Sequence, residues 1–362
     1  MKQAGIVTFH KSCNYGAVLQ AYALMSVVND LGYDTHVIDY QYVESKRMSF
    51  SAFLKKKPSV KQFVHYCLRP FLKSPMGKVR ERNFQQFRTI YMNESAAVHT
   101  PEELSGLAYD LYISGSDQIW NYHITNHVFD PVFFLQFDTG AKKLIYAASS
   151  QNPPYEPDKE QELKVLLDKM DFPVTVREKQ LADYVERLTG HTVPQVIDPT
   201  LLAGREPLDR IQLPEVNRPP YVLMYQIDAN PRTDVSIETL ERHFHCDAYS
   251  FSGPKNSRDT KRLGVMGPDE FLAMLKNADY IVTNSFHGIA LSLLYHKQFF
   301  VYENGGVMSR IDSLLESVSL TDRKIKMTAD IDVSKTIDYD KVDQGLDTLR
   351  QQSLEILKNA IS

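Results

Sequence analysis

Asn284, Ser285, His287 and Gly288 stand where a short apolar strand ends and an apolar helix begins. A strand-to-helix junction directs backbone N–H groups and the positive end of a helix dipole into one crevice, which suits an anion. The four residues are therefore candidates for an anion site, in which the histidine could also donate a proton. A simpler interpretation is a capped helix, in which Asn284 or Ser285 is the N-cap and His287 only occupies the first turn.

A second junction of the same type follows a strand expected at 110–113. Ser116, Asp117 and Gln118 lie there in a turn of small and polar residues. Open parallel sheets bind their ligands at the carboxyl ends of strands, so these side chains are candidates for contacting hydroxyl groups of a substrate. The carboxylate of Asp117 could serve as a base, or it could simply cap a helix. Trp120 could stack on a sugar, but a place in the core is the preferred interpretation.

A third junction lies between a strand expected at 5–8 and a helix expected at 17–31. Asn14 and Tyr15 are candidate ligand contacts, and Gly16 marks a point where a ligand or another part of the chain approaches closely. The sequence contains neither a GxGxxG nor a GxxxxGK[ST] motif. Sugar nucleotides, phosphates and enol acids therefore all remain candidate ligands at this stage.

The order of strand and helix signals predicts how these junctions are positioned. The chain has 362 residues, more than one hydrophobic core usually serves, so we expect a first lobe at 1–205 and a second at 206–325. About six strands are expected in the first lobe, the last of them at 193–197. A proline-rich stretch at 202–220 is typical of a linker, and a tail at 326–362 ends in a helix that packs back on the first lobe. We predict an α/β fold of two Rossmann-like, doubly wound lobes with a cleft between them.

Positive charge is concentrated in one segment. Residues 46–88 contain twelve Lys and Arg against one acidic residue, a local balance of +11, although the whole chain carries −4. Aromatic and apolar residues alternate with these charges, as in elements that bind an anionic membrane surface or another polyanion. A solvated helical excursion is an equally good interpretation. Lys55, Lys56 and Lys57 form the densest part of the segment and are the natural place to test it by charge reversal.

Cysteine content and the first residues suggest a cytoplasmic setting. Cys13, Cys67 and Cys246 are scattered, so a disulfide framework or a structural zinc site is not expected. Neither a signal peptide nor a run of 18 apolar residues is apparent. We expect a soluble cytoplasmic protein, peripheral to the inner face of the membrane if the basic segment binds lipid, and no nucleic-acid partner.

Five segments together resemble the polysaccharide pyruvyl transferase family, and the resemblance runs from about residue 5 to about residue 320. Their order and spacing are more specific than any one of them. Members of the family are understood to move the pyruvoyl unit of phosphoenolpyruvate onto two hydroxyls of one sugar, which forms a cyclic ketal and releases phosphate. The resemblance also implies a GT-B-like arrangement of the two lobes. The segments are residues 14–22, 115–121, 176–178, 197–200 and 284–288.

The resemblance implies phosphoenolpyruvate as the donor, with no other cofactor and no metal. Guanidinium groups suit its carboxylate and phosphate because their planar fork can hold two oxygens at once. Arg177, at the family's Val-Arg-Glu position, is expected to bind the donor and to act in catalysis. The alternative is a structural ion pair with Glu178 or Asp198, the latter otherwise expected only to form a turn. His287 would bind the phosphate or protonate the methylene carbon as general acid.

At one position the chain departs from the family pattern. In several members of the family the corresponding three residues resemble Arg-Leu-His, whereas this chain has Ser285, Phe286 and His287. The missing arginine leaves one anion contact to be supplied from elsewhere. Arg310 is the expected replacement because it follows a loop that contains two glycines. An ordinary surface pairing with Asp312 is the alternative.

Three functions follow from these expectations. The first is a pyruvyl ketal transferase in the biosynthesis of a bacterial surface polysaccharide, capsular or exopolysaccharide, that acts on a lipid-linked sugar acceptor held by Asn14, Tyr15, Ser116, Asp117 and Gln118. The second is a GT-B glycosyltransferase that uses a nucleotide sugar. The third is a noncatalytic, carbohydrate-binding relative that stabilises a biosynthetic complex.

Overall fold

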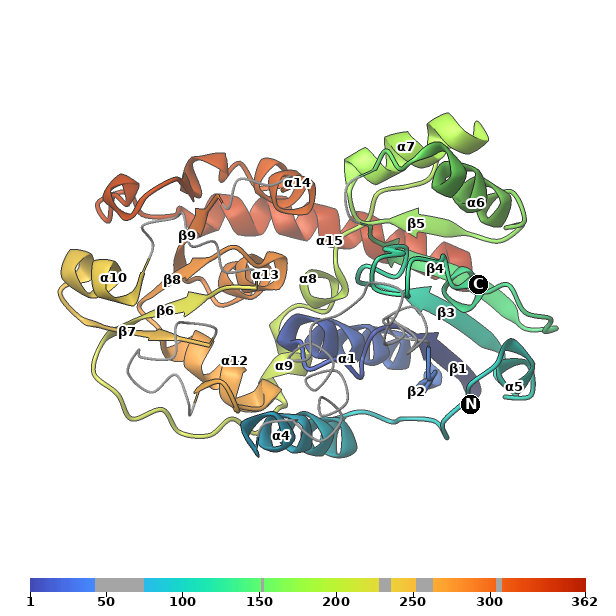
Figure 1. Cartoon of the computed structure of the whole chain (residues 1–362), viewed down its shortest axis with the longest axis horizontal. Helices are drawn as coiled ribbons and strands as arrows, with labels where there is room; N and C mark the ends of the chain where they lie inside the picture. Colours follow the sequence, from blue (N-terminus) through green and yellow to red (C-terminus); the bar gives the residue numbers. More distant parts are fainter. Residues whose placement is uncertain (43–74, 151–152, 228–235, 252–262, 304–307) are drawn as a thin grey trace, which may run out of the picture.

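The computed structural model describes residues 1–42, 75–150, 153–227, 236–251, 263–303 and 308–362. This part of the chain forms two lobes, each built on a five-stranded parallel sheet (Figure 1). The predicted α/β fold with two doubly wound lobes is confirmed. The strands of the first sheet are β1 (Lys2–Val7), β2 (Tyr33–Val37), β3 (Leu111–Gly115), β4 (Lys142–Ala148) and β5 (Val174–Val176), and those of the second are β6 (Tyr221–Tyr225), β7 (Asp247–Ser250), β8 (Tyr280–Thr283), β9 (Gln298–Tyr302) and β10 (Lys324–Ile325).

The two sheets share one strand order. The first runs β2-β1-β3-β4-β5, and the second runs β7-β6-β8-β9-β10 when read from its other edge. In both sheets the second strand lies on one side of the first strand, and the remaining strands are added on its other side. The switch point of the topology therefore lies between β1 and β3 in the first lobe and between β6 and β8 in the second. Ligands of open α/β sheets bind outside such switch points, at the carboxyl ends of the strands. The junctions after β1, β3 and β8 therefore lie where this topology favours a site.

Helices connect the strands within each lobe. In the first lobe the helical segments are α1 (Tyr15–Asp30), α4 (Pro75–Tyr91), α5 (Pro101–Ser105), η1 (Pro131–Phe134), α6 (Pro157–Leu167), α7 (Lys179–Thr189), α8 (Pro199–Ala203) and α9 (Arg205–Asp209). Those after β6 are α10 (Ile237–Phe244), α12 (Pro268–Asn277), α13 (Phe286–Leu294), α14 (Ser309–Ser317), η2 (Thr321–Arg323), η3 (Thr328–Asp330) and α15 (Tyr339–Ile361).

Helix α1 lies at the boundary between the lobes and is buried along most of its length. The side chain of Asn14 caps its first turn by accepting hydrogen bonds from the backbone N–H groups of Gly16 and Ala17, at 3.0 and 3.3 Å. The helix ends before Gly32, whose φ of +93° suits glycine. It packs against β2 and α8 on one side and against α12 of the second lobe on the other. The two lobes therefore meet through a continuous apolar core.

Helix α15 returns to the first lobe, as the sequence predicts. Figure 1 shows it running along one side of both lobes. It packs against α8 and β4, and the hydroxyl of Tyr33 donates a hydrogen bond to the carbonyl of Ile361 at 3.2 Å. The C-terminal residues of the chain are therefore held against the first sheet.

Two details of the predicted organisation are wrong. The stretch at 193–197 is not a sixth strand, because it pairs with β5 only through an isolated bridge between Val176 and Gln195. Pro194 has no N–H to donate, which prevents a regular ladder there. The stretch at 202–220 is not simply a linker, since α8 and α9 occupy its beginning and both contact α1.

The basic segment expected at 46–88 lies mostly outside the described residues, and so do Lys55, Lys56 and Lys57. Its described end forms α4, which connects the lobes. The Arg80 guanidinium donates to the carbonyls of Cys13 at 2.9 Å and of Gly264 at 3.3 Å, and the Asn83 amide donates to the carbonyl of Val265 at 2.8 Å. These basic and polar side chains therefore bind backbone carbonyls from both lobes.

Candidate functional site

The histidine junction follows β8, as predicted. Ser285 is the N-cap of α13, because its hydroxyl accepts a hydrogen bond from the Gly288 N–H at 3.2 Å. The Asn284 side chain accepts from the N–H of Ile227 at 2.9 Å, which ties the ends of β6 and β8 together at the switch point. The capped-helix interpretation is therefore confirmed. It is compatible with anion binding, since the first turn still presents backbone N–H groups and the positive end of the helix dipole.

His287 reaches across the lobe boundary to the first turn of α1. A Cβ atom added to Gly16 would lie 2.2 Å from Nδ1 and 2.3 Å from Cγ of the imidazole. The close approach predicted at Gly16 is thus made by a side chain of the other lobe. The His287 side chain is 7% exposed, so its few contacts decide which way the ring nitrogens face.

Arg177 follows β5 and donates to three side chains. Its Nη1 binds Oδ2 of Asp198 at 2.7 Å, its Nε binds Oε1 of Glu178 at 3.1 Å, and its Nη2 binds Oγ of Ser149 at 2.8 Å. The Phe286 ring covers the guanidinium plane, 4.3 Å from its carbon to the ring centroid. The ion-pair interpretation of Arg177 is confirmed. The Arg177 side chain is only 2% exposed, so direct contact with a donor would require the guanidinium to exchange these partners.

The carboxylate of Asp198 contacts nitrogen atoms of side chains from both lobes. Its Oδ2 accepts from Arg177 and lies 3.5 Å from Nε2 of His287. Its Oδ1 accepts from the backbone N–H and the hydroxyl of Thr200, at 2.9 and 2.6 Å, which also starts α8. The carboxylate is therefore held by four groups, of which the histidine alone comes from the second lobe. The sequence predicted only a turn or a pair with Arg177 at this position.

Burial and charge act in opposite directions in this cluster. Burial alone would raise the pKa of Asp198, but His287, Arg177 and Thr200 hold it well below its usual range. Burial raises the pKa of Glu178, and Arg177, Ser149 and Arg310 offset this only in part. Oε2 of Glu178 is buried and makes no hydrogen bond. Asp198 is thus the firmly ionised carboxylate of the cluster.

Asp117 and Gln118 lie half-buried at the end of β3. No helix begins there, since the next helical segment is η1, so the N-cap interpretation of Asp117 is wrong. Its backbone has a φ of +69°, which aspartate tolerates better than most residues. Burial lowers the pKa of Arg177, but the carboxylates of Glu178, Asp198 and Asp117 more than offset it. The backbone carbonyl of Asp117 accepts a hydrogen bond from the N–H of Ser149 at 3.1 Å, and Ser149 also binds Arg177, so Asp117 lies next to the Arg177 cluster.

Ser116 and Tyr15 have structural roles. Ser116 is fully buried, and its hydroxyl donates to the carbonyl of Ala147 at 2.7 Å. The Tyr15 ring stacks on Phe271 at 4.3 Å, and its hydroxyl donates to the carbonyl of Met266 at 3.1 Å. These placements argue against the predicted contact of either side chain with an acceptor. Asn14 remains half-buried at the helix start.

Trp120 belongs to the core, as preferred from the sequence. It is 1% exposed and stacks on Phe134 with ring centroids 5.3 Å apart. A sugar therefore cannot lie against its face in this structure.

A cavity of about 240 Å³ lies between the lobes beside the ion-pair cluster. Arg177 and Asp198 line it from the first lobe, Phe286 and Arg310 from the second, and α15 closes it with Ser353 and its neighbours. At about 30 Å³ per water molecule this is room for about eight waters, enough for a three-carbon phosphate ester. Asp312, the partner considered for Arg310, pairs with Lys324 at 2.9 Å.

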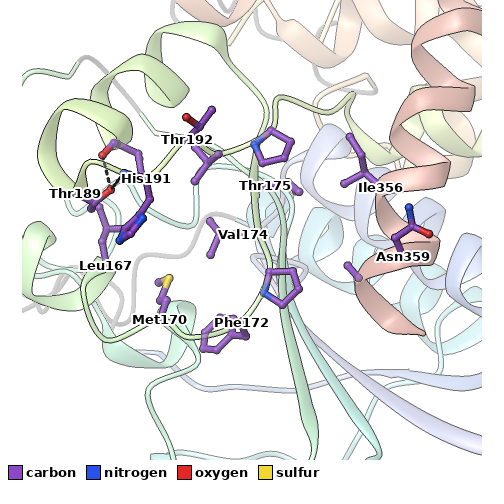
Figure 2. Close-up of a pocket in the computed structure, with 15 residues that line it drawn as sticks. Leu167, Met170, Phe172, Val174, Thr175, Thr189, His191, Thr192, Ile356 and Asn359 are labelled. Carbon is purple, nitrogen blue, oxygen red and sulfur yellow. Dashed lines mark hydrogen bonds between the residues drawn. The ribbon is translucent and has the colours of Figure 1, made fainter.

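A larger cavity, of about 520 Å³, lies beside the first residues of β5, Val174 and Thr175 (Figure 2). Its walls are mostly apolar and come from β5, α7 and the end of α15, with His191, Thr192 and Asn359 as polar members. None of the site residues predicted from the sequence lines it. Size alone therefore does not mark the candidate site.

The described residues contain no group of three or more His, Cys, Asp and Glu side chains that could hold a metal ion. Within the same part of the chain, no helix is both long and apolar enough to span a bilayer.

Sequence reasoning missed Ser149, Thr200 and the bridging role of Asp198. Ser149 is the first residue after β4, so the rule that polar residues at strand ends are candidates would have found it. The contact between Asp198 and His287 depends on how the lobes meet, and no local pattern reveals that.

Replacing Gly16 by alanine tests the contact between α1 and His287. The added methyl would lie within 2.2 Å of Nδ1, so the imidazole must move or the lobes must separate. The methyl would also lie 2.7 Å from Cβ of His287, at the base of a buried side chain, so we expect a loss of stability of about 1–3 kcal/mol together with a change in the His287 environment. Histidine ring NMR signals of the variant and the parent provide the measurement. Gly32→Ala is unsuitable as a control because of its positive φ, whereas Gly140→Ala adds a methyl where no atom lies within 4 Å. Unchanged His287 signals would show that the ring does not depend on this contact.

Comparisons with known proteins identify a family for this chain but no close relative. Over residues 14–306 the chain matches the family model for Polysaccharide pyruvyl transferase. No curated protein sequence matches it significantly. Three solved structures are similar to it at low identity: UDP-GlcNAc 2-epimerase from Methanocaldococcus jannaschii (12% identity, TM-score 0.47, covering 96% of this chain and 92% of that one), UDP-N-acetylglucosamine 2-epimerase from Rickettsia bellii (10%, 0.45, 100% and 97%), and the glycosyltransferase SsfS6 of Streptomyces sp. SF2575, complexed with thymidine diphosphate (12%, 0.43, 99% and 100%).

These structural similarities are too low to support any statement about activity. The family match is different, since it extends over most of the chain and includes all three strand-end junctions. The chain belongs to the polysaccharide pyruvyl transferase family.

Proposed function

We propose that this protein transfers the pyruvoyl unit of phosphoenolpyruvate to two hydroxyls of a sugar in surface polysaccharide biosynthesis, capsular or exopolysaccharide. The observation that carries the proposal is the meeting of two switch points: His287 of the second lobe lies against Gly16 of the first, with Asp117 near the same cluster. A potential acid and a potential base are thus supplied from opposite lobes. Family membership supports the reaction class.

On the donor side, the first turn of α13 and Arg310 would hold the anionic groups. The helix start offers backbone N–H groups, and Arg310 offers a guanidinium on the wall of the interlobe cavity. The role first expected of Arg177 becomes indirect, because its donors are already bound to Asp198, Glu178 and Ser149. It would shape the cavity rather than bind the donor directly.

The reaction then needs two proton movements. His287 donates a proton to the methylene carbon, and the first sugar hydroxyl adds to the adjacent carbon while Asp117 takes its proton. The carbon–oxygen bond to phosphate breaks, and the second hydroxyl closes the ketal as its proton leaves with the phosphate. One donor and one diol give one ketal and one phosphate. No external oxidant or reductant is involved.

The acceptor would be a lipid-linked sugar, and Asn14, Asp117 and Gln118 are the half-buried polar residues available to contact it. Binding to the inner face of the membrane is part of the same proposal, but the lysines on which it depends lie outside the described residues.

The test is incubation with phosphoenolpyruvate and an extracted lipid-linked acceptor, followed by mass measurement of the product. We expect the acceptor to gain one pyruvate less one water, with one phosphate released per product. Transfer from a nucleotide sugar instead would show a glycosyltransferase. Binding of the acceptor without either product would show a noncatalytic relative.

Arg310→Ala tests the donor side. Loss of a charge-assisted hydrogen bond is worth about 1.5–3 kcal/mol, so we expect the KM for phosphoenolpyruvate to rise about 10- to 100-fold while the KM for the acceptor stays near the parent value. Arg210→Ala is the control, because that exposed side chain pairs with Glu206 on the surface. An unchanged donor KM in the Arg310 variant would return Arg310 to a surface role.

A further inference from the structure

The cavity of about 520 Å³ beside β5, here called the outer cavity, has no part in the reaction steps described above. Its walls are formed mainly by apolar side chains such as Met170, Phe172, Val174 and Ile356 (Figure 2). None of the described residues that line it is Lys, Arg, Asp or Glu, so nothing there would balance the charge of a phosphate or a carboxylate. Its volume falls within the usual range of about 300–1,000 Å³ for small-molecule sites.

The polar groups of the outer cavity are few, and most are already engaged. The hydroxyls of Thr175, Thr189 and Thr192 each donate a hydrogen bond to another group of the protein, at 2.9–3.1 Å. His191 and Asn359 are the other polar members, and both are exposed, so they lie at its mouth. The part of a ligand buried inside must therefore be apolar, because a polar group there would lose its hydrogen bonds to water.

The outer cavity and the interlobe cavity lie end to end along one face of α15. Ser353 lines the interlobe cavity, and Ile356 lines the outer one. Residues three apart share a helix face, and these two are about 4.5 Å apart along the helix axis. The first lobe repeats the arrangement, since Pro194 lines the outer cavity and Gln195 the interlobe cavity. The N–H of Ile197 donates to Oγ of Ser353 at 3.1 Å, which holds this segment against α15.

We propose that the outer cavity binds the hydrocarbon chain of the lipid-linked acceptor, whose sugar reacts between the lobes. The inference rests on the function proposed above, because it concerns the acceptor of that reaction. Phosphoenolpyruvate has no apolar chain, whereas a lipid-linked sugar is polar at one end and apolar at the other. Its sugar must reach the donor between the lobes, so an apolar site that adjoins the interlobe cavity is placed to take the chain.

Alkyl glucosides of different chain length test the outer cavity directly. Methyl, hexyl and octyl β-glucoside share one sugar and differ only in the chain, and each is used below its micelle-forming concentration. Each methylene that enters an apolar site should tighten binding about fourfold. Isothermal titration should therefore give a Kd that falls steeply from the methyl to the octyl compound. A Kd that does not depend on chain length would overturn the proposal.

Met170→Glu places a charge in the apolar lining. Met170 is half-buried in the loop after α6, where a changed side chain disturbs no helix or strand. We expect octyl glucoside to bind about 10-fold more weakly or worse, and the KM for the lipid-linked acceptor to rise by a similar factor. The KM for phosphoenolpyruvate should stay near the parent value. Val165→Glu is the matched control, because Val165 lies on α6, is 44% exposed and does not line the cavity.

Ala360→Phe is a second variant in case the first folds poorly. It occupies part of the outer cavity with a ring instead of a charge, and Val165→Phe is its control. The dependence of Kd on chain length should be lost in Ala360→Phe and kept in the control. If the lining variants weaken octyl glucoside but leave the KM for the lipid-linked acceptor unchanged, the cavity holds some other apolar ligand and the proposal is overturned.

Competition without phosphoenolpyruvate separates failure of this inference from failure of the proposed function. We expect the extracted lipid-linked acceptor to displace octyl glucoside from the parent protein, and the saccharide freed from its lipid to leave it bound. Displacement without any pyruvyl transfer would support the lipid site and overturn the proposed reaction. Pyruvyl transfer to the lipid-linked acceptor without displacement would support the reaction and overturn the lipid site.

Discussion

Replacing His287 by glutamine is expected to lower the rate of pyruvyl transfer by about 10²–10⁴-fold, the usual contribution of a general acid. Glutamine is similar in size and can still meet Asp198, but its amide cannot deliver a proton to carbon. The α13 N-terminus and Arg310 remain in place, so the KM for phosphoenolpyruvate should change little. Steady-state kinetics with each substrate varied in turn provide the measurement.

His296→Gln is the matched control for this experiment. Like His287, His296 lies near an aspartate, but the pair is exposed on the second lobe. The control variant should transfer pyruvate at the parent rate. If His287→Gln also keeps a kcat near that of the parent, the histidine is not the proton donor, and the α13 junction would serve only to bind an anion.

The strands of both lobes could be predicted well, because parallel strands covered on both faces form short, continuously apolar runs. The strands expected at 5–8 and 110–113 overlap β1 and β3, although their bounds differ from the observed ones by one to three residues. Strand β10 could not be predicted, since Lys324–Ile325 is too short to show a pattern. The false strand at 193–197 arose because its valines outweighed the effect of Pro194.

The site was predictable as far as it follows from single strand ends. His287, Gly16, Asp117 and Arg177 were all found in this way, and the structure brings them to one boundary between the lobes. Partners across that boundary were not predictable. No local rule reveals that His287 faces a carboxylate nearly ninety residues earlier in the chain, because that contact is set by the packing of α13 against α8, whose N-cap is Asp198.

Burial changes the expectation for Arg177 in particular. If Arg177 only bound the donor, as the family resemblance implies, Arg177→Ala would abolish transfer and leave the fold intact. The structure places its guanidinium in a buried cluster with two carboxylates and a serine hydroxyl. We therefore expect Arg177→Ala to lower the free energy of unfolding as well as the rate of transfer.

We expect Arg177→Ala to lower the free energy of unfolding by about 3–5 kcal/mol, the cost of removing one partner from a buried ion pair. Glu178 can relieve part of its own cost by binding a proton, because its pKa is already raised by burial. Asp198 cannot do so as easily, since its pKa is low and it keeps only Thr200 and His287 as partners. Urea unfolding at neutral pH, followed by the midpoint and the slope, gives the measurement.

Arg187→Ala is the control that distinguishes the effect of burial from the effect of losing one arginine charge. Arg187 belongs to α7 of the same lobe and pairs with Glu160 at 2.8 Å, but its side chain is 54% exposed. Exposed pairs are worth about 0–1 kcal/mol, so this variant should unfold near the parent midpoint. Equal, small losses in both variants would mean that the Arg177 cluster opens to solvent before the protein unfolds. In that case its guanidinium would be available to bind the donor directly, as the sequence first indicated.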